Sequence, residues 1–506
     1  MARKIYAPNV HLFAFHLKDS HPPNLLWDKC NTLLSQRFGI TKTLEIEERA
    51  GYRVDLLKDK TDDDVALHFE SKVFLDGKSL PIAGLATPLR IHDTYVLALN
   101  LRRPEFDENQ KKTTPLDLNI LELLNPSGCL MPSEIRSSLG QTLLLTVWYT
   151  EEKQWLPWKS PQNRQELREL ADNCLREFIP NQYPLPNFYR EGQLFGSPIF
   201  EYGVPTQEED YYHVLIWVFC RTETDDKFTA HYSTFVSLFC HLNKVVAAFQ
   251  RSRQVHHIVR QDYQAIEPYI NKIFQGMPVD KLLTQDELNQ FKKYLKDIPQ
   301  KYLFYSQLIS ELDHYRLDVD INAQNYRREL NDLQSQLPAE DISFLSHFFN
   351  EDYHLFTEQI QSDLGYFQQG TGILEKAMAA IQGRVNLEQA ESDRSLQDTV
   401  AIVGVGLTAA AIGATVAPYV IPTEPRQPIL PPFSTNHFHP LTQSLFLSLV
   451  FGATGAVITK GLTALIQNRS AIARRLTRLI RGSSNKTAKL PTSTQQTFPQ
   501  SQKSKN

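Results

Sequence analysis

The sequence predicts an α+β protein, with an N-terminal cytosolic α/β domain, a long helical stalk region and a C-terminal hairpin of two transmembrane helices. Three observations support this prediction. Runs rich in β-branched and aromatic residues alternate with helical patterns over residues 1–230. Apolar residues then follow the helical period of about 3.6 through residues 231–398. Two long uncharged apolar runs occupy most of residues 399–466, as membrane spans would.

Strand-like segments define the first region. They are KIYAPNVHLFAFHL, GYRVDLL, VALHFESKVFL, TYVLALNLR, QTLLLTVWYT and YYHVLIWVFC. The run VLIWVF within the last segment is apolar on both faces, which indicates a central strand covered on each side. Two helices are predicted between the strands, because LLWDKCNTLLSQRF and PQNRQELRELADNCLREFI place apolar residues three and four apart.

The middle of the chain reads as helix. Residues 233–274 predict one long helix or two, and a further helix begins at Thr284, which forms a capping box with Glu287 three residues later. An apolar stripe along that helix is typical of a stalk or a coiled-coil-like hairpin. Its members are Leu308, Leu312, Tyr315, Ile321, Leu330 and Leu333. We expect Gly370 and Gly372 to break the helical region before a new stripe begins at Leu374.

The segment VAIVGVGLTAAAIG has two interpretations. Gly404, Gly406 and Ala409 match the G-x-G-x-x-G/A fingerprint of dinucleotide-binding turns, and Glu424 follows about 20 residues later. That fingerprint needs a strand before it and an amphipathic helix after it, and neither pattern is present. Because residues 400–421 contain no charged residue, a membrane span is favoured, and a dinucleotide-binding protein stays a remote alternative.

The two spans are predicted at about residues 400–421 and 443–466, joined by an outer loop over residues 422–442. Small residues recur at helical spacing in both, which allows membrane helices to pack closely. The predicted packing residues are Gly404, Gly406, Ala410, Gly413, Ala417, Gly452 and Ala456. The sharper question is whether the glycines of the first span face the second span or the axis of an oligomer.

The distribution of basic residues predicts the orientation of the spans. The outer loop holds only Arg426, whereas residues 467–506 form a basic and largely disordered tail without any acid. The topology anchor is the cluster Arg469, Arg474, Arg475, Arg478 and Arg481. By the positive-inside rule, both termini are cytoplasmic and the protein is a multi-pass protein of the plasma (inner) membrane. Five scattered cysteines suit the same reducing side.

No pattern of an enzyme stands out. The sequence has no G-x-S-x-G, H-E-x-x-H or P-loop motif, so we predict no catalytic residue and no cofactor. A net charge of -4 does not indicate a nucleic acid partner.

Candidate metal ligands are weak. Asp318, Asp320, Asn322 and Glu329 occupy positions 1, 3, 5 and 12 of a calcium loop, but Ala323 replaces the glycine that makes its turn, and the helical period continues through it. Further candidates without a zinc-site spacing are His231, Cys240, His241, His256 and His257. Whether the chain binds a metal therefore stays open.

Acidic residues precede the first span. If several copies surrounded a pore, Glu391 and Asp398 would form negatively charged rings at its mouth. The alternative is that the acids of this helix pair with Arg384 and Arg394 along it.

This layout resembles the CorA family of magnesium channels. That family has a Gly-Met-Asn signature at the outer end of the first span, where this chain reads APYVIPTEP and has no such signature. The shared layout implies a homo-oligomer with first spans around an axis. Because the signature is absent, the resemblance does not imply magnesium selectivity. We expect an oligomeric channel, transporter or membrane effector gated by a cytosolic ligand or ion. The alternative is a membrane-tethered regulator or scaffold that binds a protein partner and uses the lipid bilayer only for anchoring.

Overall fold

The computed structural model describes residues 4–58, 65–75, 77–107, 110–149, 164–207, 211–276 and 283–392, together with Phe446, Val450, Thr454 and Val457. The chain divides into two compact units. The first comprises Met1–Gly383 and Thr423–Thr442, and the second comprises Arg384–Pro422 and Gln443–Asn506. Apart from the end of one helix, everything described below belongs to the first unit.

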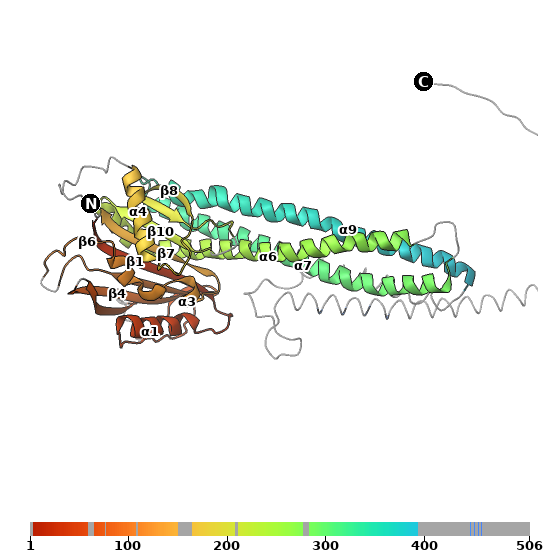
Figure 1. Cartoon of the computed structure of the whole chain (residues 1–506), viewed down its shortest axis with the longest axis horizontal. Helices are drawn as coiled ribbons and strands as arrows, with labels where there is room; N and C mark the ends of the chain where they lie inside the picture. The colour runs from red at the N-terminus through yellow and green to blue at the C-terminus, as the bar shows by residue number, and fades with distance from the viewer. Residues whose placement is uncertain are drawn as a thin grey trace, which may run out of the picture. The chain divides into compact units, whose positions relative to one another are not determined.

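A mixed sheet forms the N-terminal part, in the order β2-β4-β5-β1-β7-β10-β9-β8, with β3 paired to β4 and β6 paired to β1 (Figure 1). Its strands are β1 Lys4–Leu17, β2 Arg53–Asp55, β3 Leu67–Leu75, β4 Lys78–Ile91, β5 Thr94–Arg102, β6 Leu116–Asp117, β7 Gly140–Tyr149, β8 Phe188–Leu194, β9 Ser197–Tyr202 and β10 His213–Phe219. Within the described residues only β7 and β10 pair in parallel. All six predicted strand segments are confirmed as strands.

Strands β4, β6, β8 and β9 were not predicted. In β4, Pro81, Gly84 and Pro88 resemble the punctuation of a loop. The structure explains the glycine. A Cβ atom at Gly84 would lie 2.4 Å from the Phe69 ring and 2.5 Å from the carbonyl oxygen of Asn100. The absence of a side chain therefore lets β3 and β5 approach β4 from both sides.

Helices cover both faces of this sheet. One face packs against α1 Leu25–Phe38, α2 Ile120–Leu124, α3 Pro132–Ile135 and α4 Arg164–Phe178. The other face packs against α5 Thr222–Ala230 and the start of α6 Tyr232–Gln275, where Trp217 contacts Phe228 and Phe235. Every residue of β10 is buried, which confirms the prediction of a central strand covered on each side.

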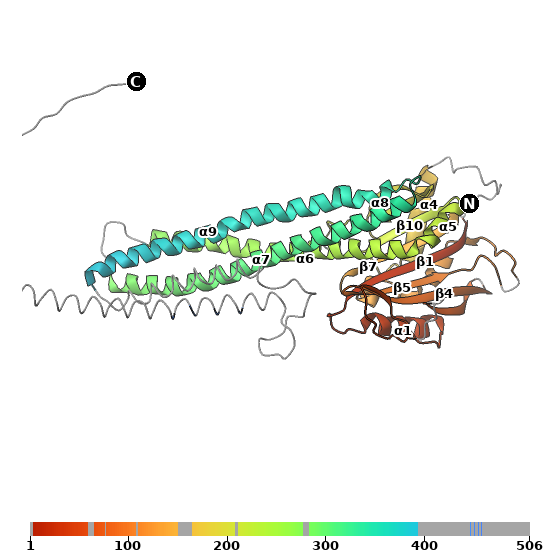
Figure 2. The same cartoon turned by 180° about the vertical axis from the view of Figure 1, so that it is seen from behind.

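Three long helices follow the sheet and lie side by side in both views (Figures 1 and 2). They are α6, α7 Gln285–Gln336 and α9 Tyr353–Ser392; α8 Ser343–His347 and the π-helical segment η2 Phe348–Asp352 connect the last two. Helix α7 begins with the predicted capping box between Thr284 and Glu287. Helix α9 packs on both partners, since Phe356 stacks on Phe249 of α6 at 4.1 Å and Tyr305 of α7 donates to the Phe367 carbonyl.

The predicted apolar stripe of α7 is wrong for one residue, Ile321. Leu308, Leu312, Leu330 and Leu333 are buried as expected, whereas Ile321 is 59% exposed. The buried positions between Leu312 and Leu330 follow the helical period, so Ile321 falls on the opposite side. Helix α7 also runs unbroken through residues 318–329, the candidate calcium loop, which agrees with the helical alternative.

The expected break at Gly370 and Gly372 is also wrong, because α9 is continuous through both. A Cβ atom at Gly370 would lie 2.7 Å from the Tyr305 hydroxyl and 2.9 Å from the Tyr263 ring. The glycine therefore serves a close approach between α9 and its neighbours instead of a turn. The stripe after it is confirmed, since Leu374, Met378 and Ile381 are buried.

Candidate functional site

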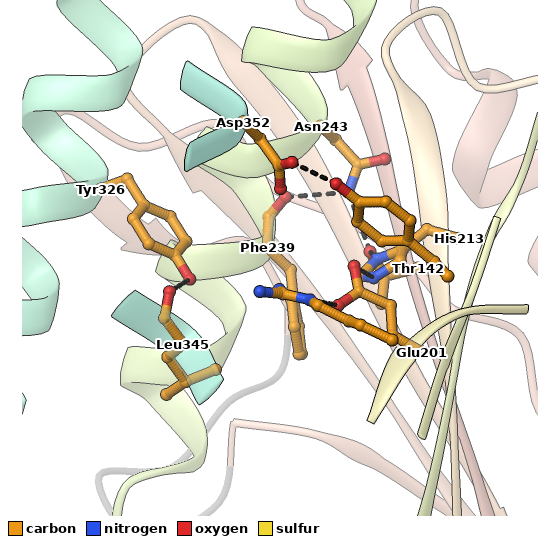
Figure 3. Close-up of polar contacts among 10 residues, drawn as sticks. Thr142, Glu201, His213, Phe239, Asn243, Tyr326, Leu345 and Asp352 are labelled. Atoms are coloured by element: carbon orange, nitrogen blue, oxygen red, sulfur yellow. Dashed lines mark hydrogen bonds and ion pairs between the residues drawn. The ribbon is translucent and has the colours of Figure 1, made fainter. Parts of the chain in front are cut away.

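Polar side chains are buried where the sheet meets the helices (Figure 3). Thr142 of β7, His213 of β10 and Glu201 of β9 are 0%, 1% and 3% exposed. The parallel register of β7 and β10 sets His213 beside Thr142. Arg190 of β8 and Asn243 of α6 complete this group, which we call the junction network. Four strands and one helix therefore each contribute one of its residues.

From Asn243 to Glu201, each residue of the junction network donates a hydrogen bond to the next. Asn243 Nδ2 donates to Thr142 Oγ1 at 2.9 Å, so the Thr142 hydroxyl is free to donate its own proton to His213 Nδ1, also at 2.9 Å. His213 Nε2 then donates to Glu201 Oε1 at 3.1 Å. This chain specifies the imidazole tautomer that carries its proton on Nε2.

The chain ends at an ion pair. Arg190 Nε donates to Glu201 Oε2, the second oxygen of the carboxylate. Burial opposes the charge of Glu201, but Arg190 and His213 outweigh it and lower the pKa of Glu201 to about 2. Burial by itself would lower the pKa of Arg190, but the attraction of Glu201 outweighs burial, so this pKa is raised. The two groups are therefore held ionised by each other inside the protein.

Strand β8 also contacts the helices through two side chains, Tyr189 and Arg190. The Tyr189 hydroxyl donates to Asp352 Oδ1, on the last residue of the π-helical segment. The Arg190 guanidinium lies 4.7 Å from the ring centre of Phe344 in α8. Burial raises the pKa of Asp352, although the Tyr189 hydroxyl and Arg190 oppose the rise. Since π-helical segments are frequent at functional positions, the start of α9 is a candidate for a controlled joint.

Helix α7 supports this joint from the other side. Tyr326 packs against Phe348 with ring centres 4.9 Å apart, and its hydroxyl donates to the Leu345 carbonyl at 2.9 Å. Lys227 of α5 forms an ion pair with Glu340, just after α7, at 2.7 Å. The segment between α7 and α9 is therefore held by side chains from β8, α5 and α7.

Hydroxyl, imidazole and carboxylate in series resemble the relay of a nucleophilic enzyme. In such enzymes the nucleophile must be open to substrate. Thr142 is closed off from solvent, and its hydroxyl already contacts Asn243 and His213. The geometry therefore favours a role in fixing the sheet against α6 and the α9 joint.

The titration of Glu201 predicts how stability depends on pH. Its folded pKa of about 2 lies below its ordinary value of 4.5, so its stabilising contribution is full above pH 4.5 and is lost as the pH falls toward 2. The thermal unfolding midpoint of the purified chain, measured from pH 6 to pH 3, should fall more steeply than that of Glu201→Gln. Parallel curves for the two proteins would contradict this assignment.

The residues predicted from the sequence to matter lie elsewhere. Outside the described residues are Gly404, Gly406, Ala410, Gly413, Ala417, Gly452, Ala456, Asp398, Arg469, Arg474, Arg475, Arg478 and Arg481. Glu391 belongs to the last turns of α9, and its side chain is not among those described. Both predicted spans also fall largely outside the described residues. Among the residues that the structure describes, no helix is long and apolar enough to cross a membrane.

Two of the histidines singled out in the sequence, His256 and His241, have an acidic partner or lie in the core. His256 faces Asp363 of α9 at 3.2 Å, beside an ion pair between Arg253 and Asp363 at 2.6 Å. His241 is buried, and burial and the nearby Lys244 lower its pKa to about 4. Over the ranges that the structure describes, His, Cys, Asp and Glu side chains form no group of three suited to a metal ion.

Sequence reasoning missed the junction network. A signal was present, since Glu201 is a lone acid among the apolar and aromatic residues of SPIFEY. Comparison with protein-family models, curated proteins and solved structures gives no match.

Proposed function

We propose that this chain is an integral membrane protein of CorA-like layout. Its α+β domain is cytosolic, and α6, α7 and α9 form a stalk that leads to two spans at about residues 400–421 and 443–466. In this proposal the protein is an oligomeric channel, transporter or membrane effector, gated by a cytosolic ligand or ion. The two uncharged runs and the basic tail support the membrane assignment.

The observation that carries the gating proposal is the origin of α9. This helix begins beside Tyr189 of β8 and extends to Ser392, eight residues before Val400 in the sequence. A change in the sheet that moved β8 would act directly on Asp352 and therefore on the first turn of α9. Because a helix is stiff along its axis, such a change would be passed toward the first span.

The contacts along α9 suit such a transmission element. Near its start, Tyr353 donates to Asp320 of α7 at 3.0 Å. In its middle, Asp363 meets Arg253 of α6, and further on Glu375 accepts from Tyr302 of α7 at 3.0 Å. Polar contacts at three levels can exchange partners as α9 shifts, which a purely apolar seam would do less readily.

The experiment is imaging of single detergent-purified particles, followed by ion flux in liposomes. The proposal expects a symmetric oligomer with first spans around its axis and a flux that Tyr189→Phe alters, because this change removes only the hydroxyl that holds Asp352. Tyr366→Phe is the matched control, since Tyr366 is an exposed tyrosine of α9. A monomer or dimer without flux would exclude the channel. A reporter fused near His437, within the predicted outer loop of residues 422–442, that gave a cytoplasmic signal would overturn the orientation.

The second candidate is a membrane-tethered regulator or scaffold. It is favoured by the way α6, α7 and α9 pack on one another within a single chain, since this packing buries Leu312, Phe356 and Phe367 without a further copy. This candidate expects that an unrelated two-helix anchor can replace both spans without loss of function. A channel would lose its flux on the same replacement.

A further inference from the structure

Strand β3 lies at an edge of the sheet. It pairs with β4 on one side, and within the described residues no strand pairs with its other side. Its even-numbered side chains, from His68 to Phe74, are all exposed, and Phe74 is 72% exposed. A long edge strand of this kind readily pairs with another strand.

The hairpin geometry indicates which backbone groups of β3 point outward. Leu75 and Lys78 pair across a two-residue loop, in which Gly77 has a φ of +76°. The flanking pair of such a loop exchanges both backbone hydrogen bonds, and the pattern then alternates. The backbone groups of the even-numbered residues are therefore directed away from β4.

Two observations agree with this alternation. Pro81, which has no backbone N–H to donate, stands opposite Lys72, where no bond to β3 is required. The carbonyl oxygen of His68 accepts a hydrogen bond from Lys42 Nζ at 2.9 Å, and Lys42 lies outside the sheet. The even-numbered backbone groups of β3 are thus directed toward the position that a neighbouring strand would take. The His68 carbonyl oxygen, which accepts from Lys42, keeps a second lone pair for such a strand.

The sequence of β3, LHFESKVFL, is complementary to itself when read in the opposite direction. With Ser71 on a twofold axis, Glu70 stands opposite Lys72 of a second copy, and His68 stands opposite Phe74. On the other face, Phe69 meets Val73. Opposite charges and apolar pairs directly across an antiparallel ladder are stabilising.

The charges select this register over its neighbours. A different register places the twofold axis at another position along β3. Only an axis that passes through a residue pairs even-numbered with even-numbered residues, which keeps the outward backbone groups of both strands facing each other. Placing the axis at Glu70 or at Lys72 would set two like charges opposite each other, which is destabilising.

We propose that β3 pairs antiparallel with β3 of a second copy of this chain, about a twofold axis at Ser71. The two sheets then continue into each other across an isologous contact. This contact goes beyond the proposed function, because it joins the sheet domains and does not depend on what the spans do.

The test is disulfide formation in the full-length protein. Ser71→Cys is made in a Cys220→Ser background, because Cys220 is the one cysteine of the five that is not buried. The two introduced thiols would face each other across the axis, so mild oxidation should yield a covalent dimer. Phe74→Cys in the same background is the control. Its position is more exposed, yet in this register it stands opposite His68 of the second copy, far from its own counterpart.

Charge reversal completes the test. In the Ser71→Cys protein, Glu70→Lys should reduce the yield of covalent dimer several-fold, and adding Lys72→Glu should restore it. Circular dichroism of each variant confirms that the chain is folded. A folded Ser71→Cys protein that gives no dimer, or equal dimer from Ser71→Cys and Phe74→Cys, would overturn the proposal, as would a yield indifferent to the charge reversals.

Discussion

Replacing Glu201 with alanine should destabilise the protein by about 3–5 kcal/mol, because it leaves the Arg190 side chain, which is only 12% exposed, without its counter-charge. Glu201 also accepts the hydrogen bond of His213, so the imidazole loses its acceptor at the same time. The measurement is urea unfolding of the purified chain followed by circular dichroism.

The matched control is Glu191→Ala. Glu191 lies on neighbouring β8 and pairs with Arg164 at 2.8 Å, but both side chains are partly open to solvent. Such a pair is worth at most about 1 kcal/mol. If Glu201→Ala cost no more than this control, the junction network would not hold the fold together. Rescue of Glu201→Ala by replacing Arg190 with methionine would support the argument, since it removes the unpaired charge.

Replacing Trp217 with alanine should cost about 3–5 kcal/mol, the range for removing a large aromatic side chain from a core. Trp217 is 0% exposed and packs against Phe195, Phe228 and Phe235, which belong to the turn between β8 and β9, to α5 and to α6. The variant should therefore loosen the attachment of α6 to the sheet in particular. Hydrogen exchange measures this directly, as faster exchange of the amides in the first turns of α6.

Trp148→Ala serves as its control. Trp148 lies on β7 and contacts Phe219 from a half-buried position, so its removal should cost clearly less and leave exchange in α6 unchanged. Equal losses for the two tryptophans, or an α6 that exchanges at its original rate in Trp217→Ala, would refute the assigned role.

Local patterns account for what could be predicted of the fold. The doubly apolar run of β10 became a strand covered on both sides, and Thr284 with Glu287 became a capping box. These features depend on residues close together in the sequence, so they can be read without knowing the fold. The candidate site was not predictable in this way, because Thr142, His213 and Glu201 come from strands whose order in the sheet had to be known first.

Two errors have the same origin. Gly370 reads as a helix breaker until Tyr305 is seen against it, and Ile321 reads as core until the side on which α6 and α9 lie is known.

The sequence alone determined the periodicity of strands and helices, the uncharged runs near the C-terminus and the self-complementary order of charges in β3. Only the tertiary structure decided that Glu201 and Arg190 share one buried ion pair, that Tyr189 holds the start of α9, and that β3 is an edge. The physical reason is that periodicity follows from backbone geometry over a few residues. Burial, charge pairing and edge position are properties of neighbours that are brought together only by the folded chain.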